Sequence, residues 1–185
     1  WATVAPGFGV SGGYADRPYP WPERRREAGP SGGEWPRSPH YGHPMDLDGA
    51  RVLVTGGSRG IGAALARAYA AAGADVVVVA RSESDLRTVA DEVGGHAVVV
   101  DLSDPAAVEA LVPRVEADLG PIDVLVNNAG VETVDMAAVI DPADVRAATR
   151  VNLEAPMVLT RYALPGMLDR GRGHIVYLSS IAGSS

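Results

Sequence analysis

The residues best suited to chemistry begin with the stretch 55–62, which reads Thr-Gly-Gly-Ser-Arg-Gly-Ile-Gly. It follows a short apolar run and precedes an alanine-rich run over 63–72, which indicates a strand, a tight turn and a helix. Gly56 would let the chain leave the strand in a conformation that a side chain resists. Because Gly60 and Gly62 lack Cβ atoms, a phosphate and the neighbouring strand can approach closely, with the helix N-terminus facing the phosphate. The stretch predicts a phosphate site, and the alternative is a bare structural turn.

The elements that must position this turn alternate between strand-like and helical runs over residues 46–185. Two of the strand-like runs, 76–79 and 98–100, consist of valine alone, which is typical of a parallel sheet covered by helices on both faces. The alternation predicts an α/β fold with a doubly wound parallel sheet, Rossmann-like in its crossovers. The expected strands are 51–55, 75–80, 97–101, 122–127 and 174–179.

Helix boundaries are also visible in the sequence. Asp104 and Asp141 each precede a proline, which is typical of an N-cap followed by proline at the first helical position. Pro113 falls inside the third helical run and is expected to kink or shorten it. The glycines expected to end helices are Gly73, Gly94 and Gly120.

Two signatures occur in a fixed order, Thr-Gly-x-x-x-Gly-Ile-Gly at 55–62 and Asn-Asn-Ala-Gly at 127–130. They resemble the short-chain dehydrogenase/reductase family, and the resemblance covers about residues 46–185. It implies an oxidoreductase that passes hydride between NADPH and a small carbonyl or alcohol substrate. The cofactor-binding residues that it implies are Gly56, Ser58, Arg59, Gly60, Ile61, Gly62, Arg81, Asp101, Leu102, Asn128, Ala129 and Gly130.

The choice between NADP and NAD depends on the end of the second strand. Ala80 stands where an acid would bind the ribose 2′-hydroxyl of NAD. Arg81 and Arg59 could instead bind the 2′-phosphate of NADP, because a guanidinium forks onto phosphate oxygens. The prediction is therefore NADP rather than NAD, and the alternative is two ordinary exposed arginines. Asp101 is expected to end the third strand and bind the adenine amino group beside the Leu102 backbone, unless it caps the next turn.

The catalytic residues that the resemblance implies are Asn152 and Ser180. Asn152 lies inside the helix that is expected to begin near Asp141, where it would support a kink and a proton-relaying water. Pro156 frees a backbone carbonyl one turn earlier, which also indicates a local break. The Ser180 hydroxyl would hold the substrate carbonyl oxygen. The alternatives are an exposed polar residue on a helix and a serine at an ordinary loop entry.

The resemblance stops before the family's proton donor, a tyrosine in a Tyr-x-x-x-Lys motif. The chain ends at Ser185, and all 16 of its basic residues are arginine. We therefore expect the N-terminal part of a reductase, incomplete at its C-terminus and inactive alone, whose full-length form is a homo-oligomer. A non-catalytic dinucleotide-binding or interaction module is the alternative. A methyltransferase is weaker, because it would usually have an acid after the second strand.

Composition bounds the remaining possibilities. The net charge of −7 argues against a nucleic-acid partner, and no apolar run is long enough to span a membrane. With no signal sequence visible, a cytoplasmic protein is expected. Residues 1–45 hold eight of the 14 prolines and eight of the 22 glycines, which predicts a disordered leader. His40 and His43 within it make a poor metal site, so no metal is expected.

Overall fold

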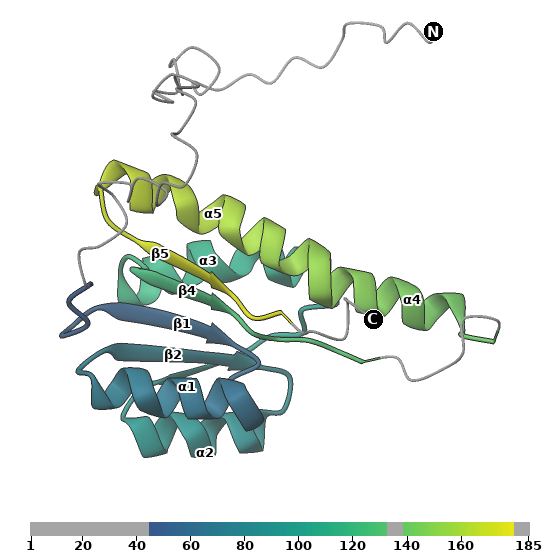
Figure 1. The fold of residues 1–185 in the computed structure, drawn as a ribbon, viewed down its shortest axis with the longest axis horizontal. Helices are drawn as coiled ribbons and strands as arrows, with labels where there is room; N and C mark the ends of the chain where they lie inside the picture. Colours follow the sequence, from purple (N-terminus) through teal and green to yellow (C-terminus); the bar gives the residue numbers. More distant parts are fainter. Residues whose placement is uncertain (1–44, 133–138, 180–185) are drawn as a thin grey trace, which may run out of the picture. The chain divides into compact units, whose positions relative to one another are not determined.

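The computed structural model describes residues 45–132 and 139–179. The predicted leader, apart from Met45, and the predicted catalytic Ser180 lie outside the described residues. The elements, drawn in Figure 1, are β1 (Arg51–Thr55), α1 (Gly60–Ala71), β2 (Asp75–Ala80), α2 (Glu83–Val93), β3 (His96–Val99), α3 (Pro105–Leu119), β4 (Val124–Asn127), α4 (Pro142–Thr149), the π-helical turn η1 (Arg150–Glu154), α5 (Ala155–Asp169) and β5 (His174–Tyr177).

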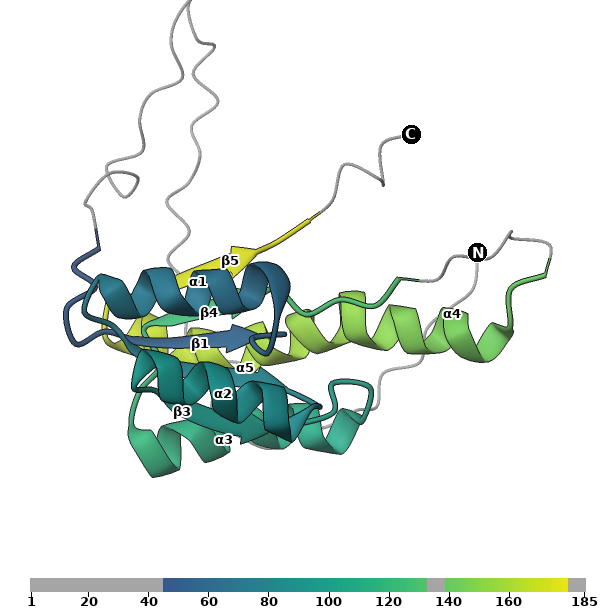
Figure 2. The same cartoon turned by 90° about the horizontal axis from the view of Figure 1, so that it is seen from below.

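The strands form one parallel sheet in the order β3-β2-β1-β4-β5. The chain moves outward from β1 to β3 and then returns to the other side of β1 to form β4, so the direction of the crossovers reverses between β1 and β4. Helices cover both faces, with α1 and α2 on one side and α3 and α5 on the other (Figures 1 and 2). The prediction of a doubly wound, Rossmann-like sheet is confirmed.

Alternate residues of the central strands are buried in two separate hydrophobic cores, one on each face of the sheet. Val52 and Val54 of β1 pack with α1 and α2, whereas Leu53 packs with α3 and α5. All three are fully buried. Burial on both faces explains the continuous apolar runs of the central strands, since each fully buried Val or Leu contributes about 1.5–3 kcal/mol.

The helix starts follow the sequence signals closely. Oδ1 of Asp104 accepts from the Ala106 N–H at 3.0 Å, and Oδ1 of Asp141 accepts from the Ala143 N–H at 2.7 Å. Each carboxylate satisfies a first-turn N–H that has no partner within the helix. Both N-cap predictions are confirmed. The glycines predicted to end helices, Gly73, Gly94 and Gly120, all have positive φ and follow α1, α2 and α3.

Pro113 was expected to kink or shorten its helix, and it does not shorten it. Helix α3 runs through it from Pro105 to Leu119. Both Pro113 and Glu109, one turn earlier, are exposed. The Glu109 carbonyl that loses its N–H partner therefore lies on the solvent side of the helix, where water can take the hydrogen bond.

Three strands are shorter than predicted. Strand β3 ends at Val99 because the next residues form a turn held by Asp101, described below. Strand β4 begins at Val124 rather than Ile122, and Oδ2 of the buried Asp123 accepts from the backbone N–H of Arg51 at 3.1 Å. Strand β5 ends at Tyr177, where it forms an edge of the described sheet.

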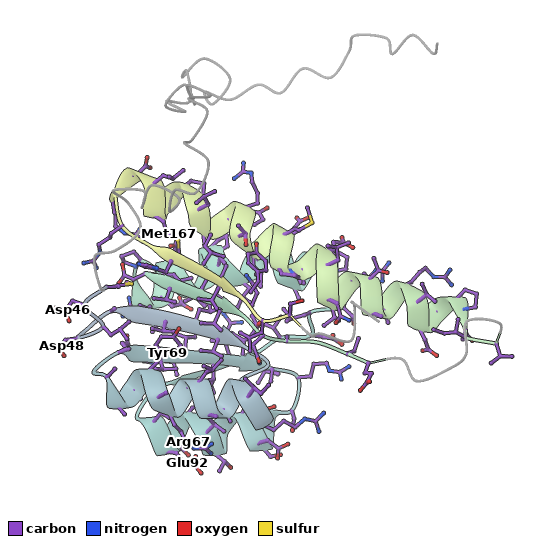
Figure 3. The ribbon with its side chains drawn as sticks, in the orientation of Figure 1. Asp46, Asp48, Arg67, Tyr69, Glu92 and Met167 are labelled. Carbon is purple, nitrogen blue, oxygen red and sulfur yellow. The ribbon has the colours of Figure 1, made fainter. Side chains whose placement is uncertain are left out.

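Helices α1 and α2 are linked on their outer side by an ion pair. Nη2 of Arg67 lies 2.5 Å from Oε2 of Glu92, and the two labelled side chains meet there in Figure 3. Both groups are about half exposed, so the pair contributes about 0–1 kcal/mol. Among the helices that the structure describes, none is both long and apolar enough to cross a membrane.

Candidate functional site

A cleft of about 660 Å³ lies at the carboxyl ends of β1 to β4, where the crossover direction reverses. Ligands of open parallel sheets bind at this position, because the loops that follow diverging crossovers separate there. The predicted site residues that line the cleft are Gly56, Ser58, Arg59, Arg81, Asp101, Leu102, Asn128, Ala129 and Gly130. They come from the ends of four different strands, so the fold brings together residues that are far apart in sequence.

The β1–α1 turn and the start of α1 contain the predicted glycines Gly56, Gly60 and Gly62. Gly56 has φ +67, and a Cβ on it would lie 2.9 Å from Cα of Ala129, so the predicted need for glycine is confirmed. A Cβ on Gly62 would lie 2.2 Å from the Gly56 carbonyl oxygen, so Gly62 lets α1 pack on the turn. Gly60, Ile61 and Gly62 do not line the cleft, and the Ile61 side chain is 65% exposed.

Thr55, which the sequence analysis did not single out, connects the ends of β1 and β4. Its buried Oγ1 donates to the Val126 carbonyl at 3.1 Å and accepts from the N–H groups of Asn128 and Ala129 at 3.0 and 3.1 Å. Nδ2 of Asn128 donates to the Thr55 carbonyl at 2.8 Å. The signal available in the sequence was a β-branched hydroxyl at the last strand position before a glycine turn.

The two adjacent asparagines behave differently. The Asn128 amide donates to the backbone of β1. The buried Asn127 amide has no hydrogen-bond partner among the described residues. Asn127 is the last residue of β4, and it lines a small cavity of about 40 Å³.

The β2 side of the cleft carries charge of both signs. Arg59 and Arg81 line it and are exposed, and within the described ranges neither forms an ion pair closer than 4.0 Å. Ser82 and Asp85 also line the cleft, and no motif in the sequence had indicated them. The Ser82 hydroxyl donates to Oδ2 of Asp85 at 3.0 Å.

Asp101 lies two residues beyond the end of β3, so the expectation that it ends the strand was wrong. Its Oδ1 accepts from the backbone N–H of Ser103 at 2.9 Å and from the Ser103 hydroxyl at 2.8 Å. These two hydrogen bonds lower the pKa of Asp101; burial opposes them, and the positive charge of Arg81 adds a smaller lowering. The carboxylate thus caps the next turn, the alternative left open by the sequence, while it also lines the cleft.

Asn152 lies in the π-helical turn η1 between α4 and α5, which confirms the predicted local break. The Ala155 N–H reaches back to the Arg150 carbonyl, five residues earlier, and Pro156 has no N–H to offer to Asn152. The Asn152 amide is paired on both sides with Val131: Oδ1 accepts from its N–H and Nδ2 donates to its carbonyl, each at 2.9 Å. Asn152 therefore attaches the segment after β4 to the long helix.

Asn152 lines the small cavity beside the main cleft rather than the cleft itself. That cavity also receives Asn127 and Tyr177, and it shares Leu102, Ala129 and Val151 with the cleft wall. The predicted pair of Asn152 and Ser180 cannot be compared directly, because the described chain ends at Ser179.

Comparisons with known proteins agree with this architecture. The family model described as short chain dehydrogenase matches residues 50–185. A short chain dehydrogenase of Pseudocercospora fijiensis is 43% identical over 143 residues, which cover 73% of this chain and 46% of that protein. The ketoacyl reductase HetN of Nostoc is 43% identical over 142 residues, which cover 74% of this chain and 50% of HetN. The 3-oxoacyl-[acyl-carrier-protein] reductase FabG of Escherichia coli is 32% identical over 142 residues, covering 76% and 58%. The chain spans about half the length of these relatives.

Solved structures give the same result. A metagenomic short-chain oxidoreductase in complex with NADP matches with a TM-score of 0.70 and 44% identity, over 76% of this chain and 66% of that chain. A short-chain dehydrogenase from Streptomyces avermitilis matches with a TM-score of 0.71 and 34% identity, over 76% and 53%. The parallel sheet, the cleft at its switch point and the family model together show that this chain belongs to the short-chain dehydrogenase/reductase family.

Proposed function

We propose that the chain binds NADP in the cleft and is the cofactor-binding part of an oxidoreductase that interconverts a small carbonyl compound and its alcohol. The observation that carries the NADP preference is a pair of arginines on the cleft wall. Arg81 directly follows Ala80 at the end of β2, and Arg59 lies in the β1–α1 turn. Two exposed guanidinium groups suit a phosphate dianion, and no acid is present at the strand end to bind a ribose 2′-hydroxyl.

The residues of the cleft fit the rest of the cofactor. The N-terminus of α1, which lacks a side-chain cap, would face the pyrophosphate, and Asp101 would accept from the adenine amino group. Ala129 and Gly130 offer backbone against which a ribose can lie. When bound, NADPH supplies the hydride for the carbonyl carbon, and the alcohol oxygen takes its proton from an acid.

The relatives support the same reaction class. HetN and FabG are named for ketoacyl and 3-oxoacyl reduction, and the metagenomic relative was solved with NADP. We extend to this chain only the shared chemistry, reduction of a carbonyl group or the reverse. Asn152 and Ser180 are the proposed catalytic residues, in the roles that the family resemblance implies.

The test is a comparison of NADPH and NADH binding to the purified chain by calorimetry. NADPH is expected to bind more tightly, and Arg81→Asp is expected to weaken NADPH binding about 10- to 100-fold, since a charge-assisted hydrogen bond contributes about 1.5–3 kcal/mol. Binding of NADH should change little or improve. Arg161→Asp is the matched control, because Arg161 is exposed on α5 and does not line the cleft. Equal affinities of the unmutated chain for NADPH and NADH would contradict the proposed preference for NADP.

A non-catalytic dinucleotide-binding module is the second candidate, because the cleft at the strand ends would serve such a module equally well. Cofactor binding without any carbonyl reduction, also in longer forms of the protein, would support it. The cytoplasmic location stays a prediction. So does the homo-oligomeric full-length form, which is supported by exposed apolar side chains along η1 and α5, namely Leu153, Met157, Tyr162 and Leu168.

A further inference from the structure

The cleft wall near Arg59 and Arg81 also contains a carboxylate, that of Asp85 in the first turn of α2. Asp85 is exposed and, among the described residues, has no basic partner within 4.0 Å. The second acid of the cleft is Asp101, which binds Ser103 with one oxygen. A negative charge therefore lines the same cleft as the two arginines that would receive a phosphate.

Hydrogen bonds hold the Asp85 carboxylate in position. The Ser82 hydroxyl donates to Oδ2 at 3.0 Å, and the Ser84 hydroxyl lies 3.5 Å from Oδ1. Ser82 occupies the N-cap position of α2, where a serine usually accepts from a backbone N–H of the first turn, but it makes no such bond. The hydroxyl that could cap the helix is instead engaged by Asp85.

A purely structural role for Asp85 would be to complement the helix dipole, because acids stabilise helix N-termini. Glu83 lies in the same first turn and carries the same charge. It pairs with Arg87 at 2.6 Å and does not line the cleft. The dipole role is thus common to both acids, whereas the position in the cleft belongs to Asp85 alone.

We propose that Asp85 is a specificity-determining residue that opposes the 2′-phosphate of NADP and thereby limits the preference for NADP over NAD. The inference rests on the proposed function, since it concerns the same cofactor cleft. NAD lacks the 2′-phosphate and meets no comparable repulsion. Ser82 is a positioning residue, because its hydroxyl holds the carboxylate that acts on the cofactor.

The decisive variant is Asp85→Asn, which removes the charge and keeps an oxygen that can accept from the Ser82 hydroxyl. Glu83→Gln is the matched control, because it removes one charge from the same turn outside the cleft. Asp85→Ser is a second neutral variant with the same expectation. Dissociation constants for NADP⁺ and NAD⁺ are measured by calorimetry on the 185-residue chain, and melting temperatures establish that each variant folds.

Asp85→Asn is expected to tighten NADP⁺ binding about five- to tenfold, from like-charge repulsion across a solvated cleft, and to leave NAD⁺ binding within about twofold. Glu83→Gln should change neither constant by more than about twofold. The gain in NADP⁺ binding should shrink in about 1 M salt, because the Debye length falls to about 3 Å.

Three results would overturn the inference. Weaker NAD⁺ binding in Asp85→Asn with unchanged NADP⁺ binding would make Asp85 an acceptor for the ribose hydroxyls. Equal changes in Asp85→Asn and Glu83→Gln would reduce the effect to the helix dipole. Unchanged constants in Asp85→Asn and Asp85→Ser would leave Asp85 without a role in specificity. If the unmutated chain binds neither dinucleotide, the proposed function itself fails, which is a different outcome from NADP⁺ binding that ignores Asp85.

Discussion

At the scale of single residues, Asp101 gives the clearest dependence on pH. Its hydrogen bonds with Ser103 lower its pKa in the folded state below the ordinary 3.8, so the folded chain binds fewer protons there than the unfolded chain at acid pH. The stability contributed by the carboxylate is therefore present above the unfolded pKa of 3.8 and lost as the pH falls through the folded pKa.

We expect the difference in melting temperature between the natural chain and Asp101→Asn to be constant from pH 5 to 8 and to shrink below about pH 4. Thermal melts followed by circular dichroism at a series of pH values measure it. Ser103→Ala removes one of the two donors to Asp101 and should move the loss toward higher pH. If this difference in melting temperature grew as the pH fell, the lowered pKa of Asp101 would be contradicted.

At the scale of elements, the long helix from Pro142 to Asp169 is interrupted by a π-helical turn that contacts the segment after β4. Asn152 makes two hydrogen bonds with the backbone of Val131 from the π-helical turn. Asn152→Ala should therefore destabilise the fold by about 1–3 kcal/mol, because each such bond contributes about 0.5–1.5 kcal/mol. Chemical denaturation measures the change in free energy of unfolding.

If Asn152 were only an exposed polar residue on a helix, Asn152→Ala would raise the free energy of unfolding instead of lowering it. Alanine is the better helix former by up to about 0.7 kcal/mol, so the same substitution would then stabilise the chain. Glu154→Ala, in the same turn and also exposed, is the control and should be neutral or slightly stabilising. The sign of the Asn152→Ala effect thus decides between the two interpretations.

At the scale of the whole molecule, the proposal separates cofactor binding from turnover. The 185-residue chain should bind NADPH but reduce no carbonyl compound at a measurable rate. In their proposed roles, Asn152 and Ser180 would orient a water and a carbonyl. General acid catalysis, typically worth ~10²–10⁴ in rate, also needs a proton donor whose pKa is tuned near neutral pH. The sequence has no lysine to tune a tyrosine in this way.

The activity is measured with a panel of ketones and ketoacyl thioesters. Oxidation of NADPH is followed by the loss of its absorbance. A longer form that includes a Tyr-x-x-x-Lys segment is the positive control and should turn over substrate. Turnover by the 185-residue chain that Ser180→Ala abolishes would show that the proton comes from another group.

The sequence alone determined the elements and their order. Valine runs with no polar face require burial on both sides, and an Asp-Pro pair or a positive-φ glycine sets a helix end by interactions within a few residues. The doubly wound sheet, both N-caps and the break near Asn152 could therefore be predicted. Gly56 belongs with them, because its conformation is fixed by the turn itself.

Tertiary structure decided how each side chain is used, because that depends on partners distant in sequence. Thr55 gains its role from residues more than 70 positions away, and the buried Asn127 amide lines a small cavity without a hydrogen-bond partner among the described residues. Asp85 becomes part of the cleft only because the β2–α2 loop folds beside the β1–α1 turn. Local chemistry specifies elements, whereas the packing of four strand ends at one switch point specifies the site.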